Sequence, residues 1–497
     1  FEGRILVVEN DFACCDSTIT NPVIRFPYEA FFDEDNTLWI ADFLEGLLKI
    51  SADESRQIFP QGLPNTTNVQ NMSAERNVVA VAPGGAGPTT SDMFSRDGVL
   101  SFIDEWWNNY HEFNYPILGD SAFLSVYSAA VDPYTDAIYY GSWTGGLAEF
   151  SNGIFTIYNE NNSIFEDVEG DPGSVRISGL AFDRFGNLWM TSFGSPKPIV
   201  VKKADGTWQS FAAAGIDDYG LTQIIIDDYD QKWMTIPKSN NQGILVFGTD
   251  ENYNNAVYKV LKSGEGSGNL PTNEVLCLAK DLEGEIWAGT AQGVVVFYCP
   301  SSVLTQQGCD AQQIIVMQNG VAGYLLETER VNTIAVDGGN RKWVGTNNGV
   351  FLLSPDGTRQ IAYYTVDNSP LLSNNITAIA INHQTGEVFI GTSKGLVSIR
   401  GEATAGEPKH SQVLVFPNPV RENYEGPIAI KGLAHNANVK ITDATGMLFF
   451  ETTAFGGQAV WDGRNYNGEK AKTGVYLIFT SNEDGSSTNV TKVMIIN

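Results

Sequence analysis

Hydrophobic residues recur along this chain in short runs that are separated by polar turns rich in glycine, asparagine and aspartate. Three segments show the pattern most clearly: 275–297 reads VLCLAKDLEGEIWAGTAQGVVVF, 331–353 reads VNTIAVDGGNRKWVGTNNGVFLL and 376–399 reads ITAIAINHQTGEVFIGTSKGLVSI. Each has an apolar run, a polar turn, an aromatic residue, a glycine two positions later and another glycine four positions after that. Short apolar runs between such turns predict antiparallel β-strands.

The same phrase recurs less regularly in segments 31–50, 129–150, 179–194 and 224–236. Its aromatic anchors are, in order, Trp39, Tyr139, Trp189, Trp233, Trp287, Trp343 and Phe389. Successive anchors are 100, 50, 44, 54, 56 and 46 residues apart, and segment 77–85 (NVVAVAPGG) is a degenerate copy inside the first gap. A period of this length predicts an all-β fold, a β-propeller of about seven to eight four-stranded blades over residues 1–399.

Each part of the phrase has an expected structural role. We expect the aromatic anchor to pack between neighbouring blades. The glycine two residues later lets strands approach closely near the axis, and the last glycine makes the turn into the third strand. We expect the turn aspartates to cap their turns rather than to bind metal, because none has the ligand spacing of an EF-hand. These aspartates are Asp33, Asp132, Asp183, Asp227, Asp281 and Asp337.

The end of the chain follows a different pattern. Residues 400–412 (RGEATAGEPKHSQ) are polar without apolar periodicity, which is typical of a linker. Residues 413–497 alternate between apolar and polar positions, with turns at 443–446 and 465–469. This alternation predicts a small C-terminal β-sandwich of Ig-like type.

The net charge of the chain excludes some classes of binding partner. The chain has 30 basic and 58 acidic side chains, a net charge of −28, and residues 413–497 hold only 7 of the basic and 8 of the acidic ones. Nearly all the negative charge therefore lies in the first 412 residues. Such a surface repels nucleic acid and anionic membranes. No apolar stretch approaches the roughly 18 residues of a membrane helix.

The five cysteines form no zinc-type pattern. They are Cys14, Cys15, Cys277, Cys299 and Cys309. Cys299 and Cys309 are ten residues apart in a loop, a spacing that allows a disulfide and would fit an oxidising compartment. The chain begins at Phe1 without an apolar signal segment, and an exported protein has lost that segment, so this start does not favour the cytoplasm.

No catalytic constellation is found. The four histidines have no H-E-x-x-H spacing, and the chain has no G-x-S-x-G, phosphate-loop or dinucleotide motif. Acidic pairs such as Glu166 and Asp167 are expected by chance among 58 carboxylates. We therefore expect a protein that is not an enzyme and has no cofactor, and a bound divalent cation is left open.

One aromatic stretch departs from the repeat: 104–115 reads DEWWNNYHEFNY. Aromatic rings among asparagine and acidic side chains suit the stacking and hydrogen bonding of a carbohydrate. The alternative is that these rings pack an outer strand against its neighbour. The candidate ligand-binding residues are Trp106, Trp107, Tyr110 and Trp143.

Two resemblances to known families follow from these motifs. The phrase lWxGTxxGl, over most of residues 31–400, resembles the repeats of the two-component regulator propeller group, which form sensor propellers and related periplasmic or surface domains of Gram-negative bacteria. The last 85 residues resemble the C-terminal sorting domain of the type IX secretion system. The residues that carry this second resemblance are Pro417, Asn418, Pro419, Val420, Gly446, Gly474, Tyr476 and the terminal segment 492–497.

Together the two parts resemble the PorZ family of type IX secretion components. That resemblance implies a protein on the outer-membrane surface, in an attachment complex with the sortase PorU and with PorV and PorQ. It implies binding of anionic lipopolysaccharide and its transfer to the sortase, without enzymatic activity. The family has two propellers, whereas 412 residues hold about eight blades at about 50 residues each, so a first propeller is missing if Phe1 is a truncation point.

Two other functions fit the same sequence. The first is a secreted surface cargo protein, a carbohydrate-binding or hydrolytic propeller whose sorting domain is cleaved after export. The second is a periplasmic sensor propeller. Sensors of this group continue into a membrane helix and a kinase, whereas this sequence ends in a predicted strand.

Overall fold

The chain forms two compact units. The computed structural model describes residues 4–7, 17–20, 24, 26–42, 46–51, 53, 55–59, 62–87, 90–212, 220–237, 243–251, 253–318 and 320–496. The smaller unit comprises Phe1–Asn65 and Glu105–Asn109, and the larger one comprises Thr66–Asp104 and Tyr110–Asn497. The division at Asn65 falls within the span that the sequence predicts to be one propeller. Cys14 and Cys15 lie outside the described residues.

The smaller unit contains one sheet that is built like a propeller blade. Its four antiparallel strands follow one another in sequence order: β3 (Pro27–Phe32), β4 (Leu38–Asp42), β5 (Gly46–Ile50) and β6 (Arg56–Phe59). A separate pair consists of β1 (Arg4–Val7) and β2 (Ser17–Thr20). Ile40 and Leu48 on the central strands are buried.

Besides a two-stranded hairpin and the two C-terminal sheets, the larger unit contains seven sheets that follow one another along the chain, which we number as blades 1 to 7. Blades 1 to 3 are β7 (Asn71–Glu75), β8 (Val78–Ala82), β9 (Val99–Ile103) and β10 (Trp106–Tyr110); β11 (Val126–Val131), β12 (Ile138–Ser142), β13 (Leu147–Ser151) and β14 (Ile154–Tyr158); and β15 (Ile177–Phe182), β16 (Leu188–Ser192), β17 (Ile199–Lys202) and β18 (Trp208–Phe211). The degenerate copy at 77–85 thus contains the second strand of blade 1. Of β10, only Tyr110 belongs to the larger unit.

Blades 4 to 7 continue the series. They are β19 (Ile224–Ile226), β20 (Lys232–Ile236), β21 (Gly243–Thr249) and β22 (Ala256–Leu261); β23 (Val275–Lys280), β24 (Ile286–Thr290), β25 (Gly293–Phe297) and β26 (Gln312–Gln313); β29 (Val331–Val336), β30 (Lys342–Thr346), β31 (Val350–Leu353) and β32 (Gln360–Tyr364); and β33 (Ile376–Asn382), β34 (Glu387–Thr392) and β35 (Gly395–Arg400). Between blades lie the helix α1 (Pro116–Asp120) and the hairpin β27 (Ile315–Gln318)–β28 (Val321–Tyr324), and the 3-10 turn η2 (Pro300–Ser302) lies within blade 5, between β25 and β26.

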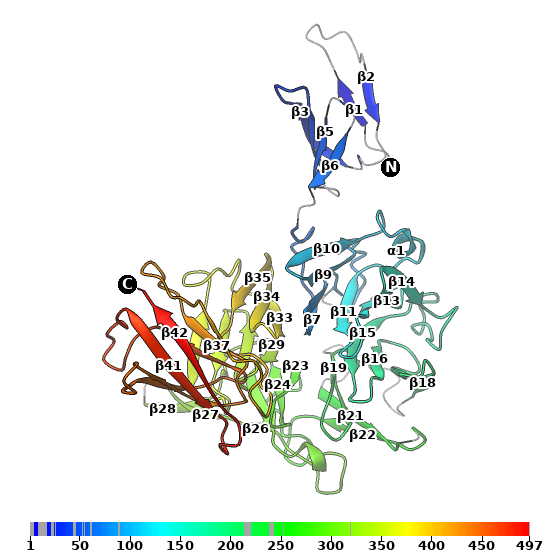
Figure 1. The fold of residues 1–497 in the computed structure, drawn as a ribbon. Coiled ribbons are helices and arrows are strands. Elements are labelled where there is room, and N and C mark those ends of the chain that lie inside the picture. Colours follow the sequence, from blue (N-terminus) through cyan, green and yellow to red (C-terminus); the bar gives the residue numbers. More distant parts are fainter. Residues whose placement is uncertain are drawn as a thin grey trace. The chain divides into compact units, whose positions relative to one another are not determined.

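The first strands of the seven blades surround a common axis (Figure 1). Each of them, β7, β11, β15, β19, β23, β29 and β33, contacts the first strand of the next blade, and β33 contacts β7. The ring is therefore closed by strands that are about 300 residues apart in the sequence. This confirms the predicted all-β propeller fold. No helix among the described residues is long and apolar enough to cross a membrane.

The glycine two residues after the aromatic anchor has the predicted role in blades 5 and 6. A Cβ on Gly289 would lie 2.5 Å from the side chain of Val331 in the next blade, and a Cβ on Gly345 would lie 2.6 Å from Ile376. No larger residue fits where the first strand of one blade crosses the second strand of its neighbour. The spacing of anchor and glycine is therefore set by how closely the blades approach.

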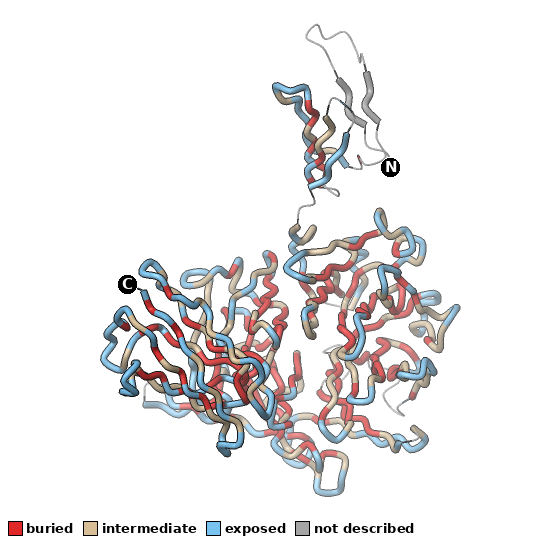
Figure 2. Tube along the Cα trace, viewed as in Figure 1, coloured by how far each residue is buried: buried red, intermediate tan, exposed pale blue. Residues whose placement is uncertain are grey.

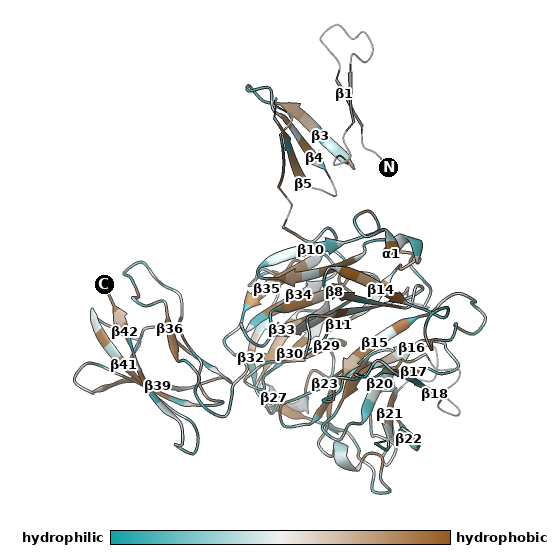
Figure 3. Cartoon of the chain, turned by 45° about the vertical axis from the view of Figure 1, so that its right-hand side comes forward, coloured by the Kyte–Doolittle hydropathy of each residue, from teal (hydrophilic) through white to brown (hydrophobic). Residues whose placement is uncertain are grey.

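The hydrophobic core lies between the blades. Trp287 of blade 5 is fully buried in one cluster with Val331 and Val344 of blade 6. Buried positions follow the strands, whereas exposed ones concentrate in the turns (Figure 2). The hydropathy of the chain follows the same division (Figure 3). The anchors thus pack between blades, as predicted.

The C-terminal segment forms two sheets around one core. One sheet has the order β36 (Leu414–Phe416), β37 (Ile428–Lys431) and β40 (Gln458–Trp461), and the other has the order β39 (Leu448–Thr453), β38 (Asn438–Thr442), β41 (Gly474–Ser481) and β42 (Thr488–Ile495). Ile430 and Trp461 of the first sheet share a buried cluster with Ile441, Ile478 and Val493 of the second. The Ig-like topology of this pair of sheets remains a prediction.

Candidate functional site

A hydrogen bond between tryptophan and aspartate fixes the first turn of five sheets. In each, the indole Nε1 of the anchor donates to Oδ2 of the aspartate six residues earlier, at 2.8–3.2 Å. The pairs are Trp39–Asp33, Trp189–Asp183, Trp233–Asp227, Trp287–Asp281 and Trp343–Asp337. In blade 3 the other oxygen, Oδ1 of Asp183, accepts the backbone N–H groups of Phe185 and Asn187 at 2.9 Å. These carboxylates are used as turn caps, as predicted.

Blade 2 departs from this arrangement. Its anchor is Tyr139, and Asp132 accepts from the backbone N–H of Tyr134 and from the hydroxyl of Thr135. The Tyr139 hydroxyl accepts instead from the ammonium of Lys202 in blade 3, at 3.2 Å. The anchor of blade 2 is therefore bonded to its neighbouring blade and not to its own turn.

Lysines lie over the anchors at two other blade interfaces. The Nζ of Lys232 is 3.9 Å from the ring centroid of Trp189, and the Nζ of Lys342 is 4.5 Å from that of Trp287. Both lysine side chains are fully buried. Burial lowers the pKa of each ammonium, and neighbouring aspartates oppose that shift. These two lysines form closed contacts between blades 3 and 4 and between blades 5 and 6.

The corresponding contact between blades 2 and 3 is open to solvent. Lys202 donates to Oε2 of Glu149 at 2.9 Å, and these side chains are 18% and 20% exposed. The hydroxyl of Tyr158 donates to the same carboxylate at 3.0 Å. Burial, and then the charge of Glu149, raise the pKa of Tyr158 to about 12 and that of Tyr139 further. Tyr139, Glu149 and Lys202 line a cleft of about 780 Å³. Both phenols stay protonated at neutral pH.

Three successive blades carry an exposed aromatic ring at the same turn position. Tyr134, Phe185 and Tyr229 each follow the turn aspartate by two residues, and they are 60%, 60% and 59% exposed. Tyr134 and Phe185 line the cleft between blades 2 and 3. The sequence interpretation missed these rings, although the triplets DPY, DRF and DDY, at the turn of each repeat, carry the signal.

The axial cavity of the ring, about 470 Å³, is lined by uncharged side chains. Several of their polar groups bond to the neighbouring blade. The hydroxyl of Ser128 donates to the carbonyl of Ile177 at 3.1 Å. The amide of Gln223 donates to the carbonyl of Leu278 and accepts from its N–H. These groups therefore join adjacent first strands.

The four predicted ligand-binding aromatics do not share one environment. Trp106 is 62% exposed and Trp107 is half-buried, and both belong to the smaller unit. Tyr110 is 7% exposed in the larger unit, where its ring packs against Phe150 and Phe155. Tyr110 thus packs against neighbouring rings within the protein, and its predicted role in ligand binding remains a prediction.

Trp143 is also packed within the protein. It is 1% exposed, and its ring lies between Tyr127 and Phe193 at centroid distances of 4.7 and 4.8 Å. Its indole N–H donates to the carbonyl of Thr90. The faces and the polar group of Trp143 are therefore used within the protein.

Asn418 and Val420 of the predicted sorting-domain motif are hydrogen-bonded to the last strand, β42, and to Ile496 after it. The amide of Asn418 donates to the carbonyl of Lys492 and accepts from the N–H of Met494, both at 3.0 Å. Val420 exchanges backbone hydrogen bonds with Met494 and Ile496 at 2.8 and 2.9 Å. The two ends of the C-terminal segment are thus hydrogen-bonded to each other along the edge of β42. Pro417 and Pro419 have no backbone N–H groups with which to make such bonds.

The remaining motif residues have structural positions. Tyr476 is 6% exposed in the core of the C-terminal segment, packed against Trp461 and Phe449. Gly446 has φ +88° in the turn before β39, and Gly474 begins β41. Their role in sorting remains a prediction.

The segment between the ring and the C-terminal sheets is ordered and partly buried. Ala403 and Thr404 are 2% and 6% exposed. The N–H of Ala405 donates to the carbonyl of His383 in blade 7 at 2.7 Å, and the carbonyl of Thr404 accepts from Gly457 at 3.0 Å. Residues 403–405 are therefore hydrogen-bonded both to the ring and to the C-terminal sheets. The predicted linker boundaries 400–412 are not otherwise tested.

Blade 6 and the C-terminal sheets also meet directly. The guanidinium of Arg341 pairs with Asp337 at 2.8 Å and lies 4.5 Å from the ring centroid of Phe455. A Cβ on Gly338 would lie 2.0 Å from the carbonyl oxygen of Thr404. The turn of blade 6 therefore requires glycine at position 338 to make its contact with the backbone of Thr404.

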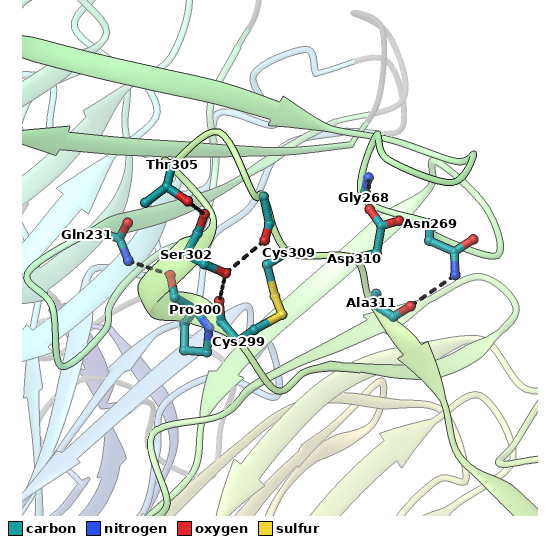
Figure 4. Close-up of a disulfide and its surroundings, with 11 residues drawn as sticks. Gln231, Gly268, Asn269, Cys299, Pro300, Ser302, Thr305, Cys309, Asp310 and Ala311 are labelled. Carbon is teal, nitrogen blue, oxygen red and sulfur yellow. Dashed lines mark hydrogen bonds between the residues drawn. A yellow bond between two sulfur atoms is a disulfide. The ribbon is translucent and has the colours of Figure 1, made fainter.

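A disulfide joins Cys299 and Cys309 in the loop after β25 (Figure 4). The hydroxyl of Ser302 donates to the carbonyl of Cys299 at 3.0 Å within the loop. The side chain of Gln231 in blade 4 donates to the carbonyl of Pro300 at 2.9 Å. The disulfide loop is thus attached to the neighbouring blade.

Comparison with known proteins rests on solved structures. No family model matches the chain, and no curated protein matches it. The structure of PorZ from Porphyromonas gingivalis, described as an essential bacterial surface component of the type-IX secretion system, matches at 26% identity with a TM-score of 0.72. The match covers 100% of this chain and 68% of PorZ. The chain is PorZ-like.

Because the whole chain is covered, the likeness to PorZ includes the C-terminal sheets as well as the ring, and the predicted resemblance is confirmed. Two more distant matches are the extracellular domain of a hybrid two-component system from B. thetaiotaomicron and the virginiamycin B lyase of Staphylococcus aureus. The first has 12% identity, a TM-score of 0.44 and coverage of 96% and 69%, and the second has 11%, 0.39 and coverage of 75% and 94%. Neither carries an argument about function.

Proposed function

We propose that this protein is a non-enzymatic component of a type IX secretion system at the outer-membrane surface. In this proposal it binds anionic lipopolysaccharide and passes it to the sortase PorU, in a complex that includes PorV and PorQ. The observation that carries the proposal is the likeness to PorZ over the whole of this chain and 68% of PorZ, at a TM-score of 0.72. A shared propeller alone would not carry it, because propellers host many unrelated functions.

Two features of the molecule support the proposal. The C-terminal sheets are bonded to blade 7 and to blade 6 through Ala405 and Arg341, as expected of a domain that is kept after export. The disulfide Cys299–Cys309 fits an exported protein, since disulfides persist in oxidising compartments.

The negative charge limits how an anionic lipid is bound. A net charge of −28 repels the phosphate groups of lipopolysaccharide at long range. Contacts with uncharged sugar hydroxyls, or bridging divalent cations, overcome this repulsion. The proposal therefore expects binding that strengthens as ionic strength rises, since salt screens the repulsion.

Affinity capture tests the proposal. The tagged chain is expressed in a bacterium with a type IX system, captured from detergent-treated outer membranes and analysed by mass spectrometry, with an unrelated acidic exported protein as control. We expect PorU, PorV and PorQ with the tagged chain and not with the control. Binding of purified lipopolysaccharide to the purified chain is measured in parallel. If both experiments are negative, the proposal fails and only an exported propeller remains.

A further inference from the structure

The interface between blades 2 and 3 is an open version of a contact that is closed elsewhere in the ring. Lys232 and Lys342 each lie over the anchor of the preceding blade and are fully buried. Lys202 lies over Tyr139 in the same way, with Nζ 5.2 Å from the ring centroid, but 18% of its side chain is exposed. Of the three interfaces with this lysine–anchor contact, only the one between blades 2 and 3 therefore has a solvent-accessible charged group.

Strand position explains why this contact is open. Lys232 and Lys342 directly precede the tryptophan anchor of their own blade. In blade 3 that position is Leu188, and Lys202 lies opposite it on β17. The ammonium thus comes from the neighbouring strand, and it extends toward Glu149 in the cleft.

The rim of the cleft is aromatic and held in place. The hydroxyl of Tyr134 donates to the carbonyl of Arg184 at 2.9 Å, which fixes this ring against the next turn. The guanidinium of Arg184 lies 4.8 Å from the ring centroid of Phe185. Tyr134 and Phe185 each keep 60% of their surface exposed. The rings of Tyr134 and Phe185 are therefore held in fixed orientations at the exposed edge of a cleft that polar side chains also line.

The floor favours an uncharged ligand. Glu149 and Lys202 neutralise each other at 2.9 Å, and the phenols of Tyr139 and Tyr158 beside them are neutral at physiological pH. The lining also includes Asp132, Asp136 and Lys203, so three carboxylates and two ammonium groups leave it with one net negative charge, which disfavours an anionic ligand. A carboxylate that accepts and an ammonium and phenol that donate match hydroxyl groups, which do both. Exposed aromatic rings match the apolar face of a sugar ring. The volume of about 780 Å³ is within the range of ligand pockets, about 300–1,000 Å³.

We propose that the cleft between blades 2 and 3 binds a neutral, hydroxyl-rich sugar residue, which stacks on Phe185 and Tyr134 and bonds to Glu149, Lys202 and Tyr139. The identity of the sugar as part of lipopolysaccharide rests on the proposed function; the site itself does not. Because the Glu149–Lys202 pair is neutral, the cleft can hold a neutral sugar of a glycan although the acidic protein repels the glycan's phosphates.

Direct binding measurements test the cleft. The first probe is the polysaccharide released from lipopolysaccharide of a type IX-secreting bacterium by mild acid, and the second is the intact lipopolysaccharide. Binding to the full chain is measured by calorimetry for the unchanged protein, for Phe185→Ala and for Glu149→Gln. Tyr229→Ala is the matched control, since Tyr229 is equally exposed at the same turn position but does not line the cleft.

We expect Phe185→Ala and Glu149→Gln each to weaken polysaccharide binding about five- to tenfold, as the loss of one stacking or charge-assisted contact does. Tyr229→Ala should bind as the unchanged protein does, and all variants should keep its unfolding temperature within a few degrees. Polysaccharide binding that is absent, or unchanged in both cleft variants, overturns the inference. If intact lipopolysaccharide still binds in that case, the proposed function stands without this site. If the cleft binds polysaccharide but intact lipopolysaccharide does not bind and the sortase complex is not captured, the site stands and the proposed function fails.

Discussion

The ammonium of Lys342 lies 2.9 Å from Oδ2 of Asp281, although the two residues belong to different blades. Both side chains are almost completely buried, at 0% and 1% exposure. The same carboxylate oxygen accepts from the indole of Trp287 at 3.2 Å. One aspartate thus caps its own turn, fixes its own anchor and pairs with the next blade.

Replacing Lys342 with methionine should strongly destabilise the ring. The substitution leaves Asp281 charged and buried without its cation, a change that costs about 3–5 kcal/mol of unfolding free energy. Denaturant unfolding followed by tryptophan fluorescence measures the loss. The control is Lys280→Met, which breaks the exposed pair with Asp228 and should cost about 0–1 kcal/mol. Equal effects of the two substitutions would contradict the role assigned to burial.

Acidification should destabilise the larger unit through His383. Burial lowers the pKa of this imidazole below 6.5, an effect that Glu75 and Asp337 partly oppose. The neutral form is favoured in the folded state, so this stabilisation is complete above pH 6.5 and is lost as pH falls below that value toward the folded pKa. The midpoint of thermal unfolding, measured from pH 7.5 to 5, should fall less steeply in His383→Gln.

The matched control for this pH dependence is His435→Gln, at an exposed histidine of the C-terminal segment. Its unfolding midpoint should follow the slope of the unchanged protein. If His383→Gln also keeps that slope, the assignment to His383 is wrong and other groups carry the pH dependence.

The Asn418 amide should control the stability of the last strand. Asn418→Ala removes its two hydrogen bonds to Lys492 and Met494 and should destabilise the C-terminal sheets by about 1–2 kcal/mol. Hydrogen exchange of peptides that contain Met494 should become faster, because its N–H loses its acceptor. The control Asn467→Ala, at an exposed turn, should leave this exchange unchanged. Unchanged exchange in Asn418→Ala would show that β42 does not depend on the motif.

Gly338 should determine whether the junction stays protected from protease. Gly338→Ala places a Cβ 2.0 Å from the carbonyl oxygen of Thr404, so the junction segment has to move. We expect trypsin to cut at Lys409 or Arg400 several-fold faster in this variant. Gly323→Ala is the control, because its Cβ would have no neighbour nearer than 3.5 Å. Equal cleavage rates would contradict a fixed junction.

The blades could be predicted from the sequence because their signals are local. The spacing from Trp287 to Gly289 and Gly293 encodes a packing contact, a close approach and a turn within one short segment. The closure of the ring by β33 and β7 could not be derived in this way, since the repeat count left seven or eight blades open and no local signal joins strands so far apart.

The site could be predicted only in part, because exposure and pairing between blades depend on tertiary structure. Trp143 and Phe185 are both aromatic residues near a turn, yet one is 1% and the other 60% exposed. The pairing of Glu149 with Lys202 depends on the register of two different sheets. The polar composition of residues 400–412 predicts a linker, whereas Ala403 and Thr404 are buried by partners outside that segment.

The central claim is that this chain is a working part of the secretion machinery and not its cargo. The most direct test is the mass of the protein recovered from the surface of intact cells, by top-down mass spectrometry. The account predicts that residues Val413–Asn497 are still present, joined to the ring through the ordered junction. A surface protein that has lost these 85 residues, with a new C-terminus near residues 400–412, would contradict it.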